Sequence, residues 1–145
     1  MIGLLQRVSA SSVAIAGEDV GRIGRGLLVL VAVQRDDAER DADRLAERIT
    51  GYRVFPDESG RMNRSVTDIG GGLLLVPQFT LAADTRKGTR ASFTRAAEPE
   101  VGERLFHRVV ERCRACLEVV ETGRFGADMQ VSLVNDGPVT FWLES

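Results

Sequence analysis

The side chains that most enzymes use for catalysis are scarce in this chain, which has one histidine and two cysteines in 145 residues. A Ser-His-Asp system is disfavoured, because His107 falls in the middle of a helical pattern, on its polar side. Cys113 and Cys116 would need two further ligands to hold zinc, and one histidine cannot supply both. We therefore expect no metal and no cofactor, and interpret the cysteines as residues of a core or a helix face.

Long hydrophobic runs are also absent. The longest, residues 27–33 and 73–77, are far too short to span a bilayer. The first residues have neither the long apolar stretch nor the cleavage site of a signal peptide. The sequence thus predicts a cytoplasmic protein without a membrane segment.

Composition and charge are ordinary for one globular domain, which we place at residues 1–145. The net charge of −2 argues against strong nonspecific binding of nucleic acid. The charge is uneven, however, because residues 85–97 contain no acid and several cations. These cations are Arg86, Lys87, Arg90 and Arg95. This segment is either a solvated loop or a surface that binds phosphates.

Hydrophobic periodicity predicts strands at both ends of the chain and two helices between them. Apolar residues alternate in 2–16 with a change of phase that indicates a bend or bulge. Asp36 and Glu39 resemble a capping box before a first helix, and Pro99 suits the first turn of a second helix, whose apolar stripe continues to Val120. Residues 17–26 are predicted to form a turn. Further strands are expected at 27–33, 52–55, 73–81, 129–134 and 139–143. This order favours an α+β fold with mainly antiparallel β-sheet.

Two segments do not fit a purely structural interpretation. In residues 77–81, Pro-Gln-Phe-Thr-Leu, a predicted strand contains a proline and meets the basic segment. Residues 135–140, Asn-Asp-Gly-Pro-Val-Thr, have the composition of a turn between two strands. No nucleophile, base and acid stand together in either segment, so chemistry motifs alone do not identify an enzyme.

These two segments and several longer ones resemble the D-aminoacyl-tRNA deacylase family along nearly the whole chain. The matching stretches include LLQRVSASSVAI, GRIGRGLLVLVAV, YRVFPDESGRMNRSV, QFTLAADTRKGTRASF and TGRFGADMQVSLVNDGPVT. The family signature N-x-G-P-x-T is complete as Asn135, Gly137, Pro138 and Thr140. The other signature, of the SQ-x-x-L type, departs from the family where Pro77 replaces serine.

The resemblance implies a fold and an activity. The expected fold is α+β, with mainly antiparallel β-sheets in a barrel-like arrangement and two α-helices packed on one side. The expected protein is a homodimer that hydrolyses the ester bond of D-aminoacyl-tRNA, and of glycine mischarged on tRNA-Ala. The products are the free amino acid and tRNA. Such an enzyme proofreads chirality in translation and needs no cofactor.

The resemblance also implies roles for single residues. Gly137 and Pro138, joined by a cis peptide bond, are expected to enter the partner subunit's site and to select the substrate. The expected catalytic residues are Gln78, Phe79 and Thr80. Either the Thr80 hydroxyl or the terminal 2′-OH of the tRNA drives the chemistry, and we favour the 2′-OH because no base for Thr80 is evident.

A second set of residues is expected to support the site. Supporting positions are Arg7, Phe125, Met129 and Asn135, although Phe125 and Met129 are equally compatible with core packing. The expected tRNA-binding residues are Arg86, Lys87 and Arg90.

Two rival functions remain open at this point. One is a tRNA-binding relative without catalysis. The other is a deacylase of L-amino acids mischarged on tRNA.

Overall fold

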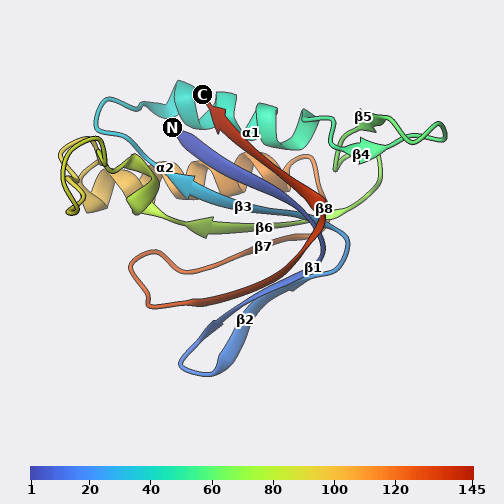
Figure 1. Cartoon of the computed structure of the whole chain (residues 1–145), viewed down its shortest axis with the longest axis horizontal. Coiled ribbons are helices and arrows are strands. Elements are labelled where there is room, and N and C mark those ends of the chain that lie inside the picture. The colour runs from blue at the N-terminus through green and yellow to red at the C-terminus, as the bar shows by residue number, and fades with distance from the viewer.

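The sheet is built around one long strand, β1 (Ile2–Ile15), in the computed structural model, which describes residues 1–145 (Figure 1). The first half of β1 pairs with β3 (Gly26–Ala32) and its second half with β2 (Glu18–Ile23). β8 (Gln130–Glu144) pairs along the opposite edge of β1. All three pairings are antiparallel, and the register shifts at Val8 and between Val13 and Ala14. These irregularities confirm the predicted bend or bulge, and the bend turns the sheet toward a barrel.

The remaining strands extend the sheet in parallel. β6 (Gly72–Pro77) pairs with β3, and β7 (Val120–Thr122) pairs with β6. Between β3 and β6 the chain forms α1 (Glu39–Gly51) and a small hairpin of β4 (Phe55–Pro56) and β5 (Met62–Arg64). Between β6 and β7 it forms the 3₁₀ helix η1 (Phe79–Ala82) and α2 (Pro99–Arg114).

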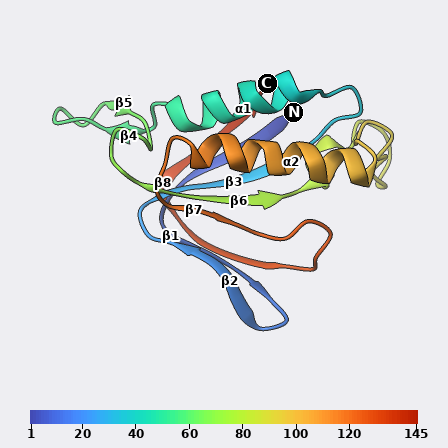
Figure 2. The same cartoon turned by 180° about the vertical axis from the view of Figure 1, so that it is seen from behind.

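The two helices lie side by side over the same face of the sheet (Figure 2). Their apolar faces and the strands beneath them enclose the main core, a cluster of 23 buried residues that includes Leu5, Leu45 and Leu105. Arg108 of α2 donates two hydrogen bonds of 2.8 Å to Asp43 of α1 and so joins the helices at the surface. An α+β fold with a mostly antiparallel, nearly closed barrel and two helices on one side is therefore confirmed.

Some predicted boundaries were wrong. α1 begins at Glu39 rather than after a capping box at Asp36, and the N–H of Ala38 donates to Asp41 Oδ2 at 2.8 Å. Residues 18–23, predicted as part of a turn, form β2. α2 ends at Arg114, so the predicted apolar stripe is interrupted.

The two cysteines consequently differ in their surroundings. Cys113 lies in the core and burial raises the pKa of its thiol to about 12. Cys116 lies past the end of α2 and is exposed. Neither forms a disulfide.

Two further corrections concern the unusual segments. The predicted strand 73–81 ends at Pro77, and the chain then turns into η1. The predicted turn 135–138 is part of one continuous strand, β8, whose pairing with β1 is irregular beside Val8.

No helix has both the length and the apolar character that crossing a membrane requires. No group of three or more histidine, cysteine and acidic side chains is arranged to hold a metal ion.

Candidate active site

The first part of the candidate site lies where β6 ends. Pro77 has no N–H to continue the ladder, and the N–H of Gln78 makes the last bond to the neighbouring strand, to Val31 O at 2.7 Å. The chain then enters η1 at Phe79. The side-chain amide of Gln78 donates to Thr80 Oγ1 at 2.5 Å and fixes both side chains.

The start of η1 leaves two backbone donors free. The first N–H groups of a helix have no acceptor within the helix. Neither the N–H of Phe79 nor that of Thr80 donates to another group of the chain. Phe79 and Thr80 are both exposed. Two adjacent, accessible N–H groups can stabilise negative charge on an oxygen atom.

The second part of the site is the Gly137–Pro138 segment of β8. Its peptide bond is cis, and both residues are exposed. Arg7, whose side chain is 13% exposed, donates from Nε to the Asp136 carbonyl at 3.0 Å and from Nη1 to the Val54 carbonyl at 2.7 Å. Arg7 therefore ties this segment to the base of the β4–β5 hairpin.

Asn135 holds the same segment from within. Its Oδ1 accepts the N–H of Val139 at 3.1 Å, and its Nδ2 donates to Thr140 Oγ1 at 2.9 Å. Gly137 has φ = +133°, a conformation that only glycine adopts readily. The signature residues thus form one hydrogen-bonded stretch of β8 that presents Gly137 and Pro138 to solvent.

The two parts lie far apart within one chain. Asn135 pairs with Val8 of β1, which pairs with Gly26 of β3, the residue opposite Gly72 at the start of β6. Pro77, at the end of β6, is opposite Val31 of β3. Gly26 and Val31 are five residues apart along β3, or about 17 Å. β1 and β3 also lie between β8 and β6 in the sheet. Gly137 and Pro138 are therefore not brought to Thr80 of their own chain.

Met129 and Phe125 lie nearer to the end of β6. Met129 Sδ accepts the N–H of Arg124 at 3.4 Å, and a Cβ added to Gly123 would stand 2.7 Å from that sulfur and 3.5 Å from Pro77 Cδ. Phe125 packs partly on the main core and on Gly102 in the first turn of α2. Both side chains are half-buried, which is compatible with wall and core roles alike.

The basic segment forms a closed loop beyond η1. Asp84 and Ser92 pair as an antiparallel bridge, and a cavity of about 500 Å³ between them is lined also by Arg86, Lys87 and Arg90. Arg86 Nε donates to Asp84 Oδ1 at 2.9 Å and holds the pKa of that carboxyl well below its usual range. Lys87 and Arg90 have no ion-pair partner, so they remain available to an anionic ligand, while Arg86 is already engaged.

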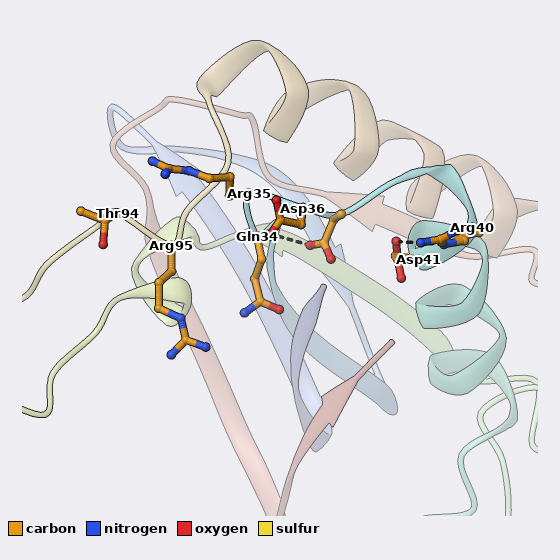
Figure 3. A pocket seen from close by; sticks show the side chains of 8 residues that line it. Gln34, Arg35, Asp36, Arg40, Asp41, Thr94 and Arg95 are labelled. Atoms are coloured by element: carbon orange, nitrogen blue, oxygen red, sulfur yellow. Dashed lines mark hydrogen bonds and ion pairs between the residues drawn. The ribbon is translucent and has the colours of Figure 1, made fainter.

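A second polar cavity, of about 330 Å³, lies between the end of β3, the start of α1 and Thr94–Arg95 (Figure 3). It contains none of the predicted site residues. Asp37 binds the N-terminal amino group at 2.7 Å and the N–H of Gln34 at 2.5 Å, and Asp41 binds the N–H of Ala38. Because these carboxylates hold the chain together, we interpret this cavity as a structural junction.

Sequence reasoning missed Phe93, which contacts Phe79 at the edge of the site, and Val54, whose carbonyl Arg7 binds. The Arg-Ala-Ser-Phe stretch stood within the basic segment, so its phenylalanine was a signal that could have been used.

The chain matches the family model described as D-Tyr-tRNA(Tyr) deacylase over residues 4–144. It is 70% identical to the D-aminoacyl-tRNA deacylase of Alkalilimnicola ehrlichii over 145 residues, which are 100% of this chain and 97% of that protein. It is 57% identical to the D-aminoacyl-tRNA deacylase of Escherichia coli O1:K1 / APEC, with 99% of each chain covered.

Solved structures agree in fold. A structure described as c-Myc DNA Unwinding Element Binding Protein has a TM-score of 0.95 and 38% identity, covering 100% of this chain and 99% of its own. A probable eukaryotic D-amino acid tRNA deacylase has a TM-score of 0.87 and 18% identity, covering 99% and 98%. At 18% identity, the second likeness concerns the fold alone.

Fold and matches together define a class, the deacylases, which are hydrolases. Within that class, the chain belongs to the D-aminoacyl-tRNA deacylase family. The family expected from the sequence is confirmed.

Proposed function

We propose that this protein hydrolyses the ester bond between a D-amino acid, or glycine mischarged on tRNA-Ala, and the 3′ end of a tRNA, in the cytoplasm. Membership of the deacylase family supports the reaction type. The observation that carries the finer proposal is a pair of segments, Gly137–Pro138 and Gln78–Thr80, whose exposed residues include Phe79, Thr80, Gly137 and Pro138 and which lie about 17 Å apart along the strands of one chain.

A homodimer joins the two segments. The edge of β8 that faces away from β1 has no partner strand. β8 also carries three exposed apolar side chains, Leu133, Val134 and Trp142. An unpaired strand edge with apolar residues favours association with a second copy, and a two-fold axis then sends each Gly137–Pro138 segment to the other subunit.

The Gly137–Pro138 segment selects the substrate by its backbone. Arg7 and Asn135 hold this segment through the Asp136 carbonyl and the Val139 N–H, and the carbonyl groups of Gly137 and Pro138 accept the hydrogen atoms of the substrate's α-amino group. An L side chain would then point into the protein backbone, whereas a D side chain points outward and glycine has none. Rejection of this kind needs no pocket for a particular side chain, so many D-amino acids are accepted.

Hydrolysis uses the free N–H groups of Phe79 and Thr80. Water attacks the ester carbonyl carbon, the two N–H groups stabilise the negative charge on the carbonyl oxygen, and the bond to the ribose oxygen breaks. The leaving ribose oxygen takes up a proton as it departs. The neighbouring 2′-OH of the tRNA positions or activates the water, because no base stands near Thr80 Oγ1, whose bonded partner is the amide of Gln78.

The basic loop holds the tRNA backbone beside the site. Lys87 and Arg90, which have no ion-pair partner, contact phosphates, and Arg86 fixes the loop through Asp84. Removing one phosphate contact lowers the slope of log KM against log salt by about one unit. A KM that does not change with salt would contradict this part of the proposal.

The deciding experiment compares D-tyrosyl-tRNA with L-tyrosyl-tRNA as substrates of the purified protein in the presence of EDTA. Rapid loss of the D-ester alone is expected. Loss of neither ester would favour the tRNA-binding relative without catalysis. Faster hydrolysis of L-alanyl-tRNA than of D-tyrosyl-tRNA would favour the L-selective deacylase.

A further inference from the structure

Two phenylalanine rings lie in contact on the surface beside the end of β6. Phe79 is 57% exposed and Phe93 is 45% exposed, and their ring centroids are 5.1 Å apart. The four other phenylalanines of the chain are buried or half-buried. Because an apolar ring gains free energy when it leaves water, an exposed pair of rings indicates a surface that meets a ligand.

The backbone holds both rings in place without a ligand. Phe79 begins η1, which is seated on the sheet through Ala82, 3% exposed. Phe93 directly follows the bridge in which Asp84 and Ser92 exchange hydrogen bonds of 2.8 and 3.0 Å, and its own carbonyl accepts the N–H of Ala96 at 3.0 Å. The ring pair is thus preorganised, which lowers the entropy lost when a ligand binds.

Charge around the rings identifies the kind of ligand. The loop that the Asp84–Ser92 bridge closes carries Lys87 and Arg90 without partners, and its one acid is bound to Arg86. Exposed aromatic rings beside free cations are the features with which proteins bind unpaired nucleotides, since bases stack on the rings and phosphates meet the cations.

We propose that Phe93, together with Phe79, stacks on a base of the unpaired 3′ end of the tRNA. This inference rests on the proposed function, which supplies the single-stranded end. Phe79 stands between Gln78 and Thr80, so a base on its ring brings the attached ester to the free N–H groups. Phe93 does not touch the reacting atoms and is a positioning residue.

Steady-state kinetics of Phe93→Leu and Phe93→Trp test the stacking. Phe93→Leu raises KM for D-aminoacyl-tRNA about tenfold, equivalent to about 1.4 kcal/mol, and leaves kcat unchanged. Phe93→Trp keeps an aromatic face and restores the wild-type KM. Val119→Ala, at a side chain that is also 45% exposed but lies before β7, is the matched control and changes neither constant.

A double-mutant cycle, which combines Phe93→Leu with removal of single bases, shows which base is involved. It measures binding affinity and does not depend on catalysis. An uncharged oligoribonucleotide with the tRNA 3′ sequence is titrated into wild type and Phe93→Leu, with each unpaired base removed in turn. At one position, loss of the base weakens binding to wild type about tenfold and does not weaken binding to Phe93→Leu further. Equal losses in both proteins at every position would overturn the proposal.

Two other results separate the possible failures. If Phe93→Leu dissociates the dimer in light scattering, the ring packs on the partner subunit and the stacking proposal is wrong. If wild type hydrolyses the D-ester and Phe93→Leu has an unchanged KM, stacking is refuted while the proposed function stands. If wild type hydrolyses no ester, the proposed function itself fails.

Discussion

Replacing Gly137 by alanine places one methyl group at the centre of the Gly137–Pro138 segment, which we propose selects the substrate and call the selector. Gly137 has φ = +133°, and a Cβ built on it would stand 2.7 Å from Val139 Cγ2, 3.1 Å from Val139 N and 3.2 Å from Arg7 Nη2. Contacts under 3.0 Å force a shift, and an L-residue rarely adopts this φ. Rotation of the Val139 side chain can relieve the 2.7 Å contact, but only a change of the backbone can relieve the strained φ, so we expect the backbone of the Gly137–Pro138 segment to shift.

The size of the effect follows from these contacts. A residue held in this region of φ costs about 1–3 kcal/mol. For a chain of this length, that lowers Tm by about 3–10 °C, which a typical domain survives. A displacement of about 1 Å in a positioning group lowers activity about 100-fold, so kcat/KM for D-tyrosyl-tRNA is expected to fall at least that far.

The assay measures Tm and D-tyrosyl-tRNA hydrolysis of Gly137→Ala beside Gly17→Ala. Gly17 also has a positive φ, +82°, but an added Cβ would meet no atom within 4 Å. Gly17→Ala thus carries a backbone cost without touching the selector and retains its activity. The reasoning is refuted if Gly137→Ala hydrolyses the D-ester at the wild-type rate, or if both variants lose activity equally.

Four further substitutions test separate parts of the site and fold. Arg7→Gln removes a charged donor from two backbone carbonyls and should cost about 1–3 kcal/mol in urea denaturation, with a lower ratio of D- to L-ester hydrolysis; an unchanged ratio would remove Arg7 from the selector. Pro77→Ser should leave deacylation within a few-fold, because the backbone beyond it supplies the oxyanion donors, and a hundred-fold gain would show that the missing hydroxyl matters. Phe79→Pro deletes one free N–H and should lower kcat about 100-fold or more, while Phe79→Leu keeps that N–H and the wild-type kcat and raises only KM, because it loses the stacking ring; equal kcat values in the two variants would contradict the oxyanion role. Hydrogen bonds, the largest from Asn63, lower the pKa of Asp57, so its stabilisation is complete above its unfolded pKa of about 4 and is lost as pH falls further. Chemical denaturation should therefore show wild type more stable than Asp57→Asn at pH 7 and the difference shrinking below pH 4; a constant difference would refute it.

The sequence predicted best those elements whose apolar pattern is long and regular. The two helices and the long first strand were recognised because each buries one continuous stripe against the same core. The start of α1 was missed because residues 36–41 offer acids at several positions. Asp37 is used by the N-terminal amino group, 36 residues away, and no local pattern reveals such a contact.

The unusual segments were misread for a related reason. Residues 135–138 have the composition of a turn, yet they lie inside β8, because Asn135 and Thr140 on either side of 136–139 pair with Val8 and Gln6 of β1 and Asn135 accepts the N–H of Val139. In 73–81, a continuous apolar run up to Val76 is followed by Gln-Phe-Thr-Leu, which suits a strand or a 3₁₀ turn equally, and the missing N–H of Pro77 marks the change. In both segments, local composition is compatible with more than one backbone conformation, and contacts with strands distant in the sequence determine which one forms.

The candidate site was predictable as residue types but not as an arrangement. The resemblance supplied Gln78, Thr80, Gly137 and Pro138, but no sequence pattern shows that register separates these residues within one chain. Phe93 was overlooked because an isolated phenylalanine in a loop is indistinguishable from a core residue until its exposure is known.

A site composed of two subunits is tested most directly by mixing two inactive variants. Phe79→Pro removes an oxyanion donor from one segment, and Gly137→Ala disturbs the selector on the other. If subunits exchange freely, half of the dimers are mixed and each has one site with both segments intact, so about a quarter of wild-type D-tyrosyl-tRNA hydrolysis returns. If both segments served the same chain, every site would contain a defect, and the mixture would show no more than the mean of the two variants alone.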